Sequence, residues 1–383
     1  MPRSMQKNRV SNWIFQRVSN AVYSLCNIPN RLIPPPFRLM QIGSLFWQSR
    51  CLYAAACLNV ADHIEDKAIS IEKLADACDA DKQYLYRLMR MLCAMGVFKE
   101  GESKYFSHNR NSRALRTNAD NSVKSMILMH NSPEFSRPWF TNFEGHIKEG
   151  SVPFEGVYER EMFDYMNDHP KVSDLFSDAM DTVDHLTGLQ YLQDFNWANF
   201  GRIIDLGGAK GSKSASILSS YKHLTAVIVD RSNVESTARE YWHTHLNDVV
   251  RKRLDFYPAD ILNDPLPNAV SDKDIYLCVA IFHLLNDTRA KELLKNIHRA
   301  MGEHNATLAI VDAVLPEKGT DLNLAAMDMQ MLMGTRGRER TVSEWNKLFV
   351  QSPFYLAETV SVRSFAKVMV LKKREELKRA VSN

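Results

Sequence analysis

Six segments rich in β-branched residues alternate with helical stretches after Gly201, and this alternation constrains the fold more than any other feature of the sequence. The segments are residues 202–206, 226–230, 254–257, 275–280, 307–311 and 366–371. Strands separated by helices form a largely parallel sheet whose two faces are both covered. We therefore predict an α/β fold with a Rossmann-like, doubly wound sheet in the C-terminal half of the chain.

The first of these segments runs into a glycine-rich turn, Ile-Ile-Asp-Leu-Gly-Gly-Ala-Lys-Gly at residues 203–211, and a helix is predicted to start near Ser214. Such a turn lets backbone N–H groups and a helix N-terminus approach a ligand closely. Leu206 occupies the place of the first glycine of the dinucleotide fingerprint, and Asp205 ends the strand. A pyrophosphate disfavours a neighbouring carboxylate, whereas the ammonium and sulfonium groups of S-adenosylmethionine are cations and tolerate one.

Acidic residues follow three successive predicted strands: Asp205, Asp230 and Asp260. We expect Asp230 to bind both ribose hydroxyls and Asp260 to accept a hydrogen bond from the adenine amino group. One such residue alone often only caps a helix, but three beside a glycine turn predict an S-adenosylmethionine site. The residues assigned to this cofactor are Asp205, Gly207, Gly208, Gly211, Asp230, Arg231, Asp260 and Ile261.

Length, charge and cysteine pattern narrow the classes of partner. A chain of 383 residues is expected to form more than one domain. The net charge of +3, with acidic and basic residues mixed, favours a small-molecule substrate over nucleic acid. The six cysteines form no C-x-x-C pair, so we expect no metal site. No apolar run approaches the ~20 residues that span a bilayer, so we expect no membrane partner and a cytoplasmic protein.

The first 36 residues are predicted to form an N-terminal arm that Pro34–Pro36 separate from the rest. No acidic residue precedes Asp62, and apolar residues recur at helical spacing between Val10 and Leu25. This pattern fits an amphipathic helix packed on a partner subunit, and it also fits an organelle presequence. Residues 39–60 are apolar on most faces and predict one buried helix.

Residues 70–106 carry the pattern of a winged helix. A capped helix begins at Ser70, a second follows Asp81 with Leu85, Met89 and Leu92 on one face, and a short hairpin is expected around residues 96–106. We predict a helical, winged-helix-like dimerisation domain at residues 37–120. The second helix has no run of basic residues, which argues against DNA binding.

The segment from Ser122 to Leu192 is helical in pattern and rich in Met and aromatic residues. Most of these side chains belong to the core on general grounds, and some are expected to line a pocket for a flat organic substrate. Residues 121–383 are therefore predicted to combine a helical substrate segment with the cofactor-binding catalytic domain. The charged run 372–379 is expected to be a solvated tail.

Several of these motifs together make the sequence similar to the plant caffeate and vertebrate acetylserotonin type of O-methyltransferase, over about residues 40–371. The motifs are residues 88–98, 205–211, 277–283, 314–317 and 337–341, with Glu344 and Trp345 after the last of them. The resemblance implies S-adenosylmethionine as cofactor, a homodimer, and a substrate among small aromatic or polyketide-type secondary metabolites.

The resemblance also implies a general base. His283 matches the histidine that takes the proton from the substrate hydroxyl, a task that suits a side chain with a pKa near neutrality. Asp312 and Glu339 match the carboxylates that hold the imidazole. The residues expected on the substrate side are His130, Asn131, Trp139, Phe163 and Met180.

Two departures from the family pattern leave an alternative open. Leu284 and Leu285 stand where the family usually has Asp and Trp, and Asp312 replaces a Glu, so its carboxylate reaches about one methylene less far. Some fungal relatives keep this fold and catalyse pericyclic ring closure without methyl transfer, and His130 would be the polar catalyst in that case. A dimeric regulatory protein that uses the winged helix is a third, non-enzymatic reading.

Overall fold

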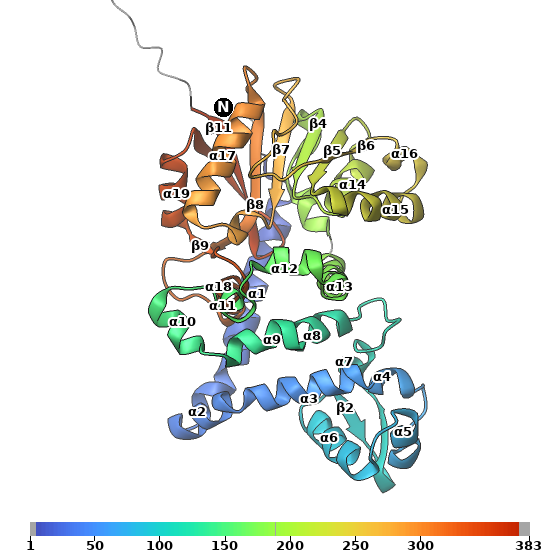
Figure 1. The fold of residues 1–383 in the computed structure, drawn as a ribbon. Helices are drawn as coiled ribbons and strands as arrows, with labels where there is room; N and C mark the ends of the chain where they lie inside the picture. The colour runs from blue at the N-terminus through green and yellow to red at the C-terminus, as the bar shows by residue number, and fades with distance from the viewer. Residues whose placement is uncertain (1–4, 188, 375–383) are drawn as a thin grey trace, which may run out of the picture. The chain divides into compact units, whose positions relative to one another are not determined.

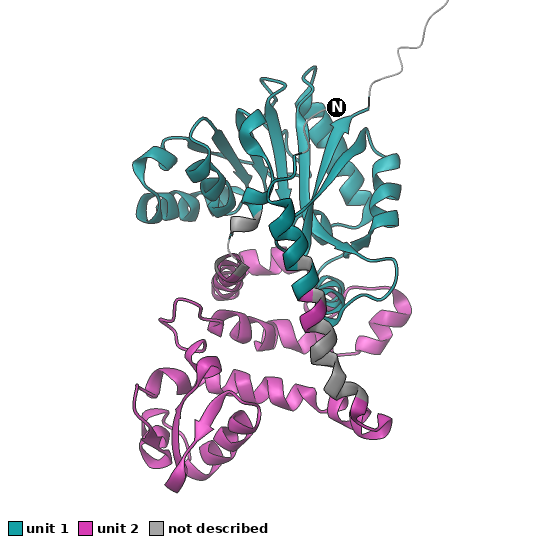
Figure 2. Ribbon diagram, turned by 180° about the vertical axis from the view of Figure 1, so that it is seen from behind, with its two compact units in different colours: residues 1–18, 189–383 teal, residues 19–188 magenta. Residues whose placement is uncertain are grey.

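The computed structural model describes residues 5–187 and 189–374, and the chain forms two compact units. Residues 1–18 and 189–383 make up one, here called the sheet unit, and residues 19–188 make up the other, the helical unit. Figure 2 colours them separately, and each is described by itself. Residues 1–18, part of the predicted arm, belong to the sheet unit, and residues 121–188, part of the predicted catalytic region, belong to the helical unit.

The sheet unit is built on one sheet of eight strands in the order β10-β11-β8-β7-β4-β5-β6, with β9 paired to β8 (Figure 1). The five strands β4 to β8 pair in parallel, and β10 and β11 join as an antiparallel hairpin. The bounds are β4 Arg202–Leu206, β5 Thr225–Asp230, β6 Leu254–Pro258, β7 Asp274–Val279, β8 Thr307–Leu315, β9 Arg340–Thr341, β10 Phe354–Ser361 and β11 Ala366–Lys373.

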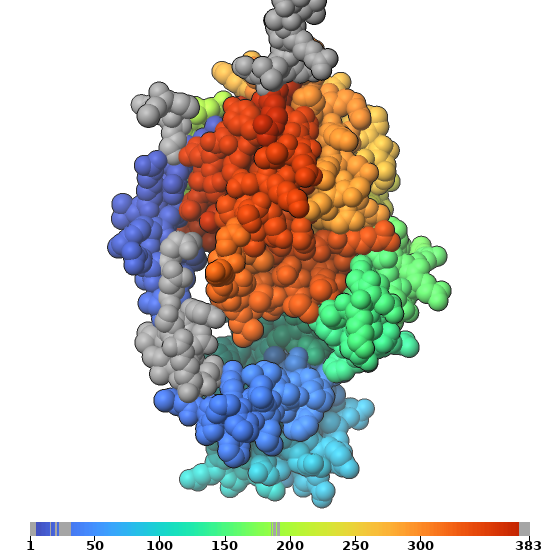
Figure 3. All heavy atoms as spheres, turned by 90° about the vertical axis from the view of Figure 1, so that its left-hand side faces the viewer, coloured from blue at the N-terminus to red at the C-terminus, as the bar shows by residue number. Residues whose placement is uncertain are grey.

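This topology confirms the predicted Rossmann-like sheet, including all six predicted strands. The sequence did not predict β9 and β10. Strand β10 lies at the edge and alternates buried Phe354 and Val360 with exposed Tyr355, so it lacks the continuous apolar run of a strand buried on both faces. In the space-filling view, the atoms of α19, β10 and β11 pack into one continuous surface (Figure 3, orange to red).

Helices cover both faces of this sheet. Ile204 and Tyr276 belong to one apolar cluster with side chains of α17 and α19, whereas Ile203 and Ile275 belong to a second with side chains of α14. Because successive side chains of a strand point to opposite faces, the two clusters form two cores. The helices are α14 Ser212–Ser220, α15 Glu235–His245, α16 Asp248–Arg251, α17 Asp287–Met301, α18 Leu322–Gly334 and α19 Val342–Val350, with short 3₁₀ turns η2 Leu189–Asp194, η3 Trp197–Asn199, η4 Ser232–Val234 and η5 Phe282–Leu284.

The start of the chain is bonded to the sheet unit. Gln6 forms an isolated antiparallel bridge with Phe195, and the side chain of Asn8 donates to Asp194 Oδ1 at 2.8 Å. Asn12 is buried and donates to the carbonyl of Ser361 at 2.9 Å. Helix α1, Arg9–Leu32, continues from these contacts. Residues 5–12 of the predicted arm therefore pack on their own chain.

The helical unit contains the predicted winged helix. Strands β1 Ile69–Ser70, β3 Tyr105–His108 and β2 Phe98–Glu100 form a small antiparallel sheet in that order beside α5 Ile71–Ala77 and α6 Lys82–Ala94. The side chain of Ser70 accepts from the Lys73 N–H, and Asp81 accepts from two N–H groups of α6, so both predicted helix starts are capped. The remaining helices are α7 Arg110–Arg113, α8 Lys124–Asn131, α9 Pro133–Phe140, α10 Phe143–Glu149, α11 Pro153–Tyr158, α12 Met162–Asp168 and α13 Pro170–Thr187, and the 3₁₀ turn η1 spans Glu102–Lys104.

The single buried helix predicted for residues 39–60 is wrong. The segment forms α2 Pro35–Gly43, α3 Leu45–Cys57 and α4 Val60–His63, and Asn59 adopts a left-handed conformation with φ 53°. No residue of α2 is buried, and in α3 only Ala55 and Ala56 are. The apolar residues on most faces therefore reflect exposed apolar surface. The predicted break at Pro34–Pro36 is correct, because Pro35 begins α2.

Two predictions lie partly outside the described residues. The side chain of Cys26 and residues 375–379 of the expected solvated tail are not among them.

Candidate functional site

The glycine turn after β4 is shaped by close approach of backbone to neighbouring side chains. Gly207 and Gly211 have positive φ angles of 69° and 75°, and α14 begins at Ser212, two residues earlier than predicted. A Cβ on Gly208 would lie 2.9 Å from Asp205 Cγ and 2.9 Å from Ile228 Cγ2. Glycine is therefore required where the turn packs against the ends of β4 and β5.

The two acidic residues at the ends of β4 and β5 are both held from the protein side. Asp205 is buried, and its Oδ2 accepts from Ser214 Oγ at 2.6 Å. Asp230 accepts from the N–H groups of Ala209 and Arg231 at 2.8 Å each, which ties the glycine turn to the end of β5. Burial raises the pKa of the Asp230 carboxyl above its usual range.

Of the remaining predicted cofactor residues, Ile261 lies beside this turn and Asp260 precedes Ile261 in the chain. A Cβ on Gly207 would lie 4.0 Å from Ile261 Cδ1, so Ile261 packs next to the glycines. Asp260 accepts from the Leu262 N–H and from Asn263 Nδ2, both at 2.9 Å, and thus caps its own turn as well. Sequence reasoning missed Trp242, whose Nε1 donates to the Lys210 carbonyl at 2.7 Å and fixes the turn from α15.

His283 and its two predicted carboxylates come together at the carboxyl ends of β7 and β8. His283 Nδ1 lies 2.8 Å from Glu339 Oε1 and 3.8 Å from Asp312 Oδ1, and all three side chains are buried. His283 sits on η5 directly after β7, Asp312 is in β8, and Glu339 immediately precedes β9. Because β4 and β7 are parallel neighbours, the glycine turn lies at the same edge of the sheet.

The charges around His283 favour its protonated form. Burial opposes protonation, but the Asp312 carboxylate and the hydrogen bond and charge of Glu339 outweigh it and raise the pKa of His283. Burial also raises the pKa of Asp312, to about 7. With Nδ1 facing a carboxylate, the neutral ring carries its proton on Nδ1 and leaves Nε2 as the nitrogen that accepts a proton.

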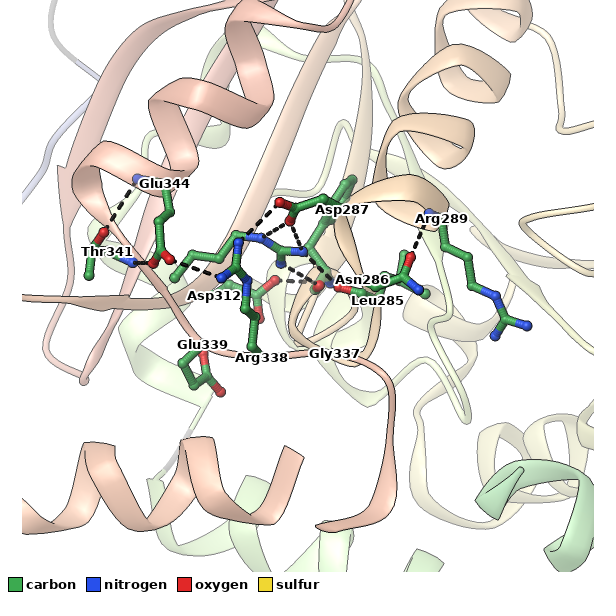
Figure 4. Close-up of polar contacts among 12 residues, drawn as sticks. Leu285, Asn286, Asp287, Arg289, Asp312, Gly337, Arg338, Glu339, Thr341 and Glu344 are labelled. Carbon is green, nitrogen blue, oxygen red and sulfur yellow. Dashed lines mark hydrogen bonds and ion pairs between the residues drawn. The ribbon is translucent and has the colours of Figure 1, made fainter. Parts of the chain in front are cut away.

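The segment after His283 is held by residues to which the sequence assigned no role. Figure 4 draws the polar contacts around Asp287, Arg338 and Glu344. Arg338 binds Asp287 Oδ2 and Glu344 Oε1 at 3.0 Å each, and the fully buried Arg340 binds Asp287 Oδ1 at 2.9 Å. The motif at residues 337–341 was visible in the sequence, but only Glu339 was given a function.

The five residues predicted on the substrate side all belong to the helical unit, and they lie in different local environments there. Asn131 accepts from Ser49 Oγ at 2.9 Å, and His130 is exposed. The ring of Trp139 lies 5.3 Å from that of Phe143, and Phe163 meets Phe176 edge-on at 6.0 Å. Met180 is 36% exposed. Their roles toward a substrate stay predictions.

Within the described residues, no group of three or more His, Cys, Asp or Glu side chains is placed to hold a metal ion.

Among the described residues, no helix combines the length and the apolar character that a bilayer crossing requires.

Known proteins resemble the chain over most of its length. A family model described as an O-methyltransferase domain matches residues 140–355, and one described as an O-methyltransferase dimerisation domain matches residues 40–118. Phenazine O-methyltransferase of Lysobacter antibioticus is 26% identical over 332 residues, which is 87% of this chain and 94% of the relative. Mitomycin biosynthesis 6-O-methyltransferase of Streptomyces lavendulae is 25% identical over 307 residues, 80% of this chain and 85% of the relative.

Solved structures show the same fold. The crystal structure of LaPhzM superimposes with a TM-score of 0.81 at 26% identity and covers 89% of this chain and 100% of its own. Human N-acetylserotonin methyltransferase in complex with S-adenosylmethionine has a TM-score of 0.77 at 21% identity, with coverages of 89% and 99%.

Proposed function

Because this chain belongs to the S-adenosylmethionine-dependent O-methyltransferase family, we propose that it methylates a hydroxyl group of a small aromatic or polyketide-type metabolite with His283 as general base. The observation that carries the mechanism is the 2.8 Å contact between His283 Nδ1 and Glu339 Oε1 in a buried site. A carboxylate in that place orients the ring and stabilises the imidazolium that forms when Nε2 accepts a proton.

The residues around the glycine turn fit the cofactor. The glycine turn packs tightly against the end of β4, since a Cβ on Gly208 would be 2.9 Å from Asp205 Cγ, and it leads into the N-terminus of α14, whose free N–H groups suit a ligand with oxygen acceptors. Asp205 and Asp230 supply carboxylates that suit cationic and hydroxyl groups. We propose that Gly207, Gly208, Gly211 and these two acids hold S-adenosylmethionine, with Arg231, Asp260 and Ile261 at its nucleoside end. When bound, the cofactor supplies an electrophilic methyl group on a sulfonium.

The chain's own groups then move one proton. Nε2 of His283 would take the proton of the substrate hydroxyl and so make its oxygen a better nucleophile toward the methyl group that a bound cofactor would supply. Glu339 keeps the Nδ1 proton in place, and the charge of Asp312 at 3.8 Å stabilises the imidazolium further. The proton leaves to solvent after the product departs.

The substrate class is supported by the helical unit and by the relatives. Their names indicate phenazine and mitomycin chemistry, both built on aromatic or quinone-like rings. We propose that His130, Asn131, Trp139, Phe163 and Met180 contact such a ring system. The intact His283–Glu339 contact favours proton removal over the pericyclic alternative, which has no need of a buried carboxylate behind the histidine.

A homodimer is the proposed assembly, because the dimerisation domain matches residues 40–118. We further propose an arm at residues 1–36, a winged-helix-like domain at 37–120 and a catalytic region at 121–383 as the functional division, in a cytoplasmic enzyme that does not bind nucleic acid.

The decisive experiment combines methyl-labelled S-adenosylmethionine with a panel of hydroxyphenazines and simple phenols and measures product by mass spectrometry. Wild type should add one methyl group, and His283→Ala should lower kcat/KM by about 100-fold or more. The control is His304→Ala, whose side chain is partly exposed beside Asp272 at 3.4 Å and should keep full activity. A product of unchanged mass would support ring closure, and a wild-type rate in His283→Ala would exclude the proposed base.

A further inference from the structure

We propose that Arg340 is a positioning residue that holds His283 against Glu339, an inference that rests on the proposed function of His283 as base. Arg340 is fully buried, with an exposed fraction of 0%. Its Nη1 donates to the carbonyl of Phe282 at 2.8 Å and its Nη2 to the carbonyl of Leu285 at 2.7 Å. Phe282 directly precedes His283 and Leu285 follows it by two residues, so one side chain holds the His283 segment from both sides.

The guanidinium is anchored at its other edge. Nε and Nη2 of Arg340 lie 3.1 and 2.9 Å from Asp287 Oδ1, and Arg338 binds the second oxygen of that carboxylate at 3.0 Å. The side chain of Arg340 also lies over the Trp345 ring, 5.2 Å from its centroid. The guanidinium makes four contacts through a planar fork of three nitrogens, whereas a lysine ammonium carries its three donors on a single nitrogen and cannot match this arrangement.

The backbone of Arg340 connects the other two members of the site. Glu339 is its immediate neighbour in the chain, and Arg340 pairs in parallel with Val314 of β8, two residues beyond Asp312. The side chain of Arg340 thus fixes the His283 segment. Its main chain follows Glu339 directly and pairs with β8, the strand that carries Asp312. One residue therefore sets the mutual placement of all three groups.

The leucines after His283, one of the two departures from the family pattern, make the contacts of Arg340 with the His283 segment important. Leu284 and Leu285 provide no polar side chain next to the base, and Leu285 is buried. The segment that begins at Gly337 packs with its backbone directly against the backbone of His283, because a Cβ on Gly337 would lie only 1.9 Å from the carbonyl oxygen of His283. In this chain the hydrogen bonds of Arg340 supply the orientation that side chains next to the histidine do not.

The test is Arg340→Lys, which keeps the charge and removes the fork. We expect kcat to fall about 10- to 100-fold, the size of effect produced by misplacing a catalytic group by about 1 Å. S-adenosylhomocysteine affinity, measured by calorimetry, should not change, because the glycine turn has its own contacts. Asp287→Asn keeps an oxygen acceptor for Arg340 and should lower kcat less, which provides a second variant if the lysine variant folds poorly.

The readout that separates positioning from general structure is the pKa of His283, followed by NMR of histidine-labelled protein and assigned with His283→Gln. Burial lowers the pKa of His283 and the contact with Glu339 raises it. A looser contact with Glu339 in Arg340→Lys should therefore move the pKa of His283 down from its raised value. The matched control is Arg202→Lys, which breaks another guanidinium pair, the partly buried contact of Arg202 in β4 with Asp274 Oδ2 at 2.5 Å. It should lower thermal stability without moving the pKa of His283.

Two outcomes are distinguishable. If wild type transfers no methyl group, the proposed function fails, although the titration still reports whether Arg340 positions the ring. If wild type is active and Arg340→Lys keeps both the wild-type kcat and the wild-type pKa of His283, the inference about Arg340 is overturned while the function stands.

Discussion

The two carboxylates beside His283 differ in distance, and the difference predicts unequal roles. Glu339 is within hydrogen-bond distance of Nδ1 at 2.8 Å, whereas Asp312 is 3.8 Å away. Glu339→Gln should therefore lower kcat/KM by about 100-fold, because the ring loses both its charged partner and its fixed tautomer. Asp312→Asn should cost about tenfold, the factor for one pKa unit of base strength. Steady-state kinetics on both variants measure the ranking, and equal losses would contradict it.

The raised pKa values of Asp312 and His283 predict how stability depends on pH. Asp312 titrates near 7 in the folded protein and near its ordinary value when unfolded, so the native state binds more protons between these values. The pKa of His283 is raised as well. The stability that Asp312 contributes is present below its ordinary pKa and is lost as pH rises to about 7, and the stability that His283 contributes is present below its ordinary pKa and is lost as pH rises above it.

Asp312→Asn removes the part of that loss that comes from Asp312, because its amide does not ionise and can still accept from the Phe282 N–H at the position of Oδ2. Thermal melts between pH 5 and 8, a range that includes the raised pKa of Asp312, should show a smaller decline of Tm for the variant than for wild type. A parallel decline in both proteins would mean that Asp312 does not titrate in this range.

At the residue level, properties that depend on the residue type or on a local motif could be predicted from the sequence. The shorter reach of Asp312 follows from its having one methylene fewer than glutamate, and the 3.8 Å distance agrees with it. The roles of Arg340 and Trp242 could not be predicted, because their hydrogen-bond acceptors lie 58, 55 and 32 residues away in the chain. Such contacts exist only once β7, β8 and β9, or the glycine turn and α15, have come together.

At the level of elements, the strands that alternate with helices were predictable, and β10 and the helix breaks were not. Strands β4, β5, β7 and β8 are apolar runs between helices, and the edge strand β6 was predicted although it is largely exposed. The opposite edge strand, β10, is only partly buried and was not predicted. The break between α2 and α3 falls at Gly43 and Ser44, a Gly/Ser pair that can interrupt a helix, but the apolar residues around it favoured one buried helix. The sequence pattern of an apolar helix face is the same whether that face packs into the core of its own chain or stays exposed to bind a partner.

The glycine turn provides a prediction at this level. Gly208→Ala would place a Cβ 2.9 Å from Asp205 Cγ and Ile228 Cγ2, so the turn must shift away from β5. We expect S-adenosylhomocysteine affinity to fall about tenfold or more, because the donors of the turn act only when held in place. Calorimetry measures the change, and Gly101→Ala is the control, since its Cβ would make an ordinary 3.6 Å contact with Tyr105 O. Equal affinities would exclude the turn as the cofactor site.

For the whole molecule, the exposed apolar surface of α2 and α3 is the feature that most needs a partner. Seven large apolar side chains there are at least 46% exposed: Phe37, Leu39, Met40, Ile42, Leu45, Phe46 and Trp47. Monomeric proteins rarely leave such a group in water, and the match to a dimerisation domain begins at residue 40. We expect these side chains to be buried between two copies of the chain.

Light scattering after size-exclusion chromatography should therefore give twice the chain mass of 43.9 kDa for wild type. The double variant Met40→Lys with Trp47→Lys should elute as a monomer, because two charges would have to be buried at the contact. Each of these side chains is more than half exposed in the single chain, so the subunit itself should keep its fold and its circular dichroism spectrum. Val249→Lys changes a side chain that is 65% exposed on α16 and should remain dimeric. A monomeric wild type, or a double variant that stays dimeric, would show that α2 and α3 do not form the contact.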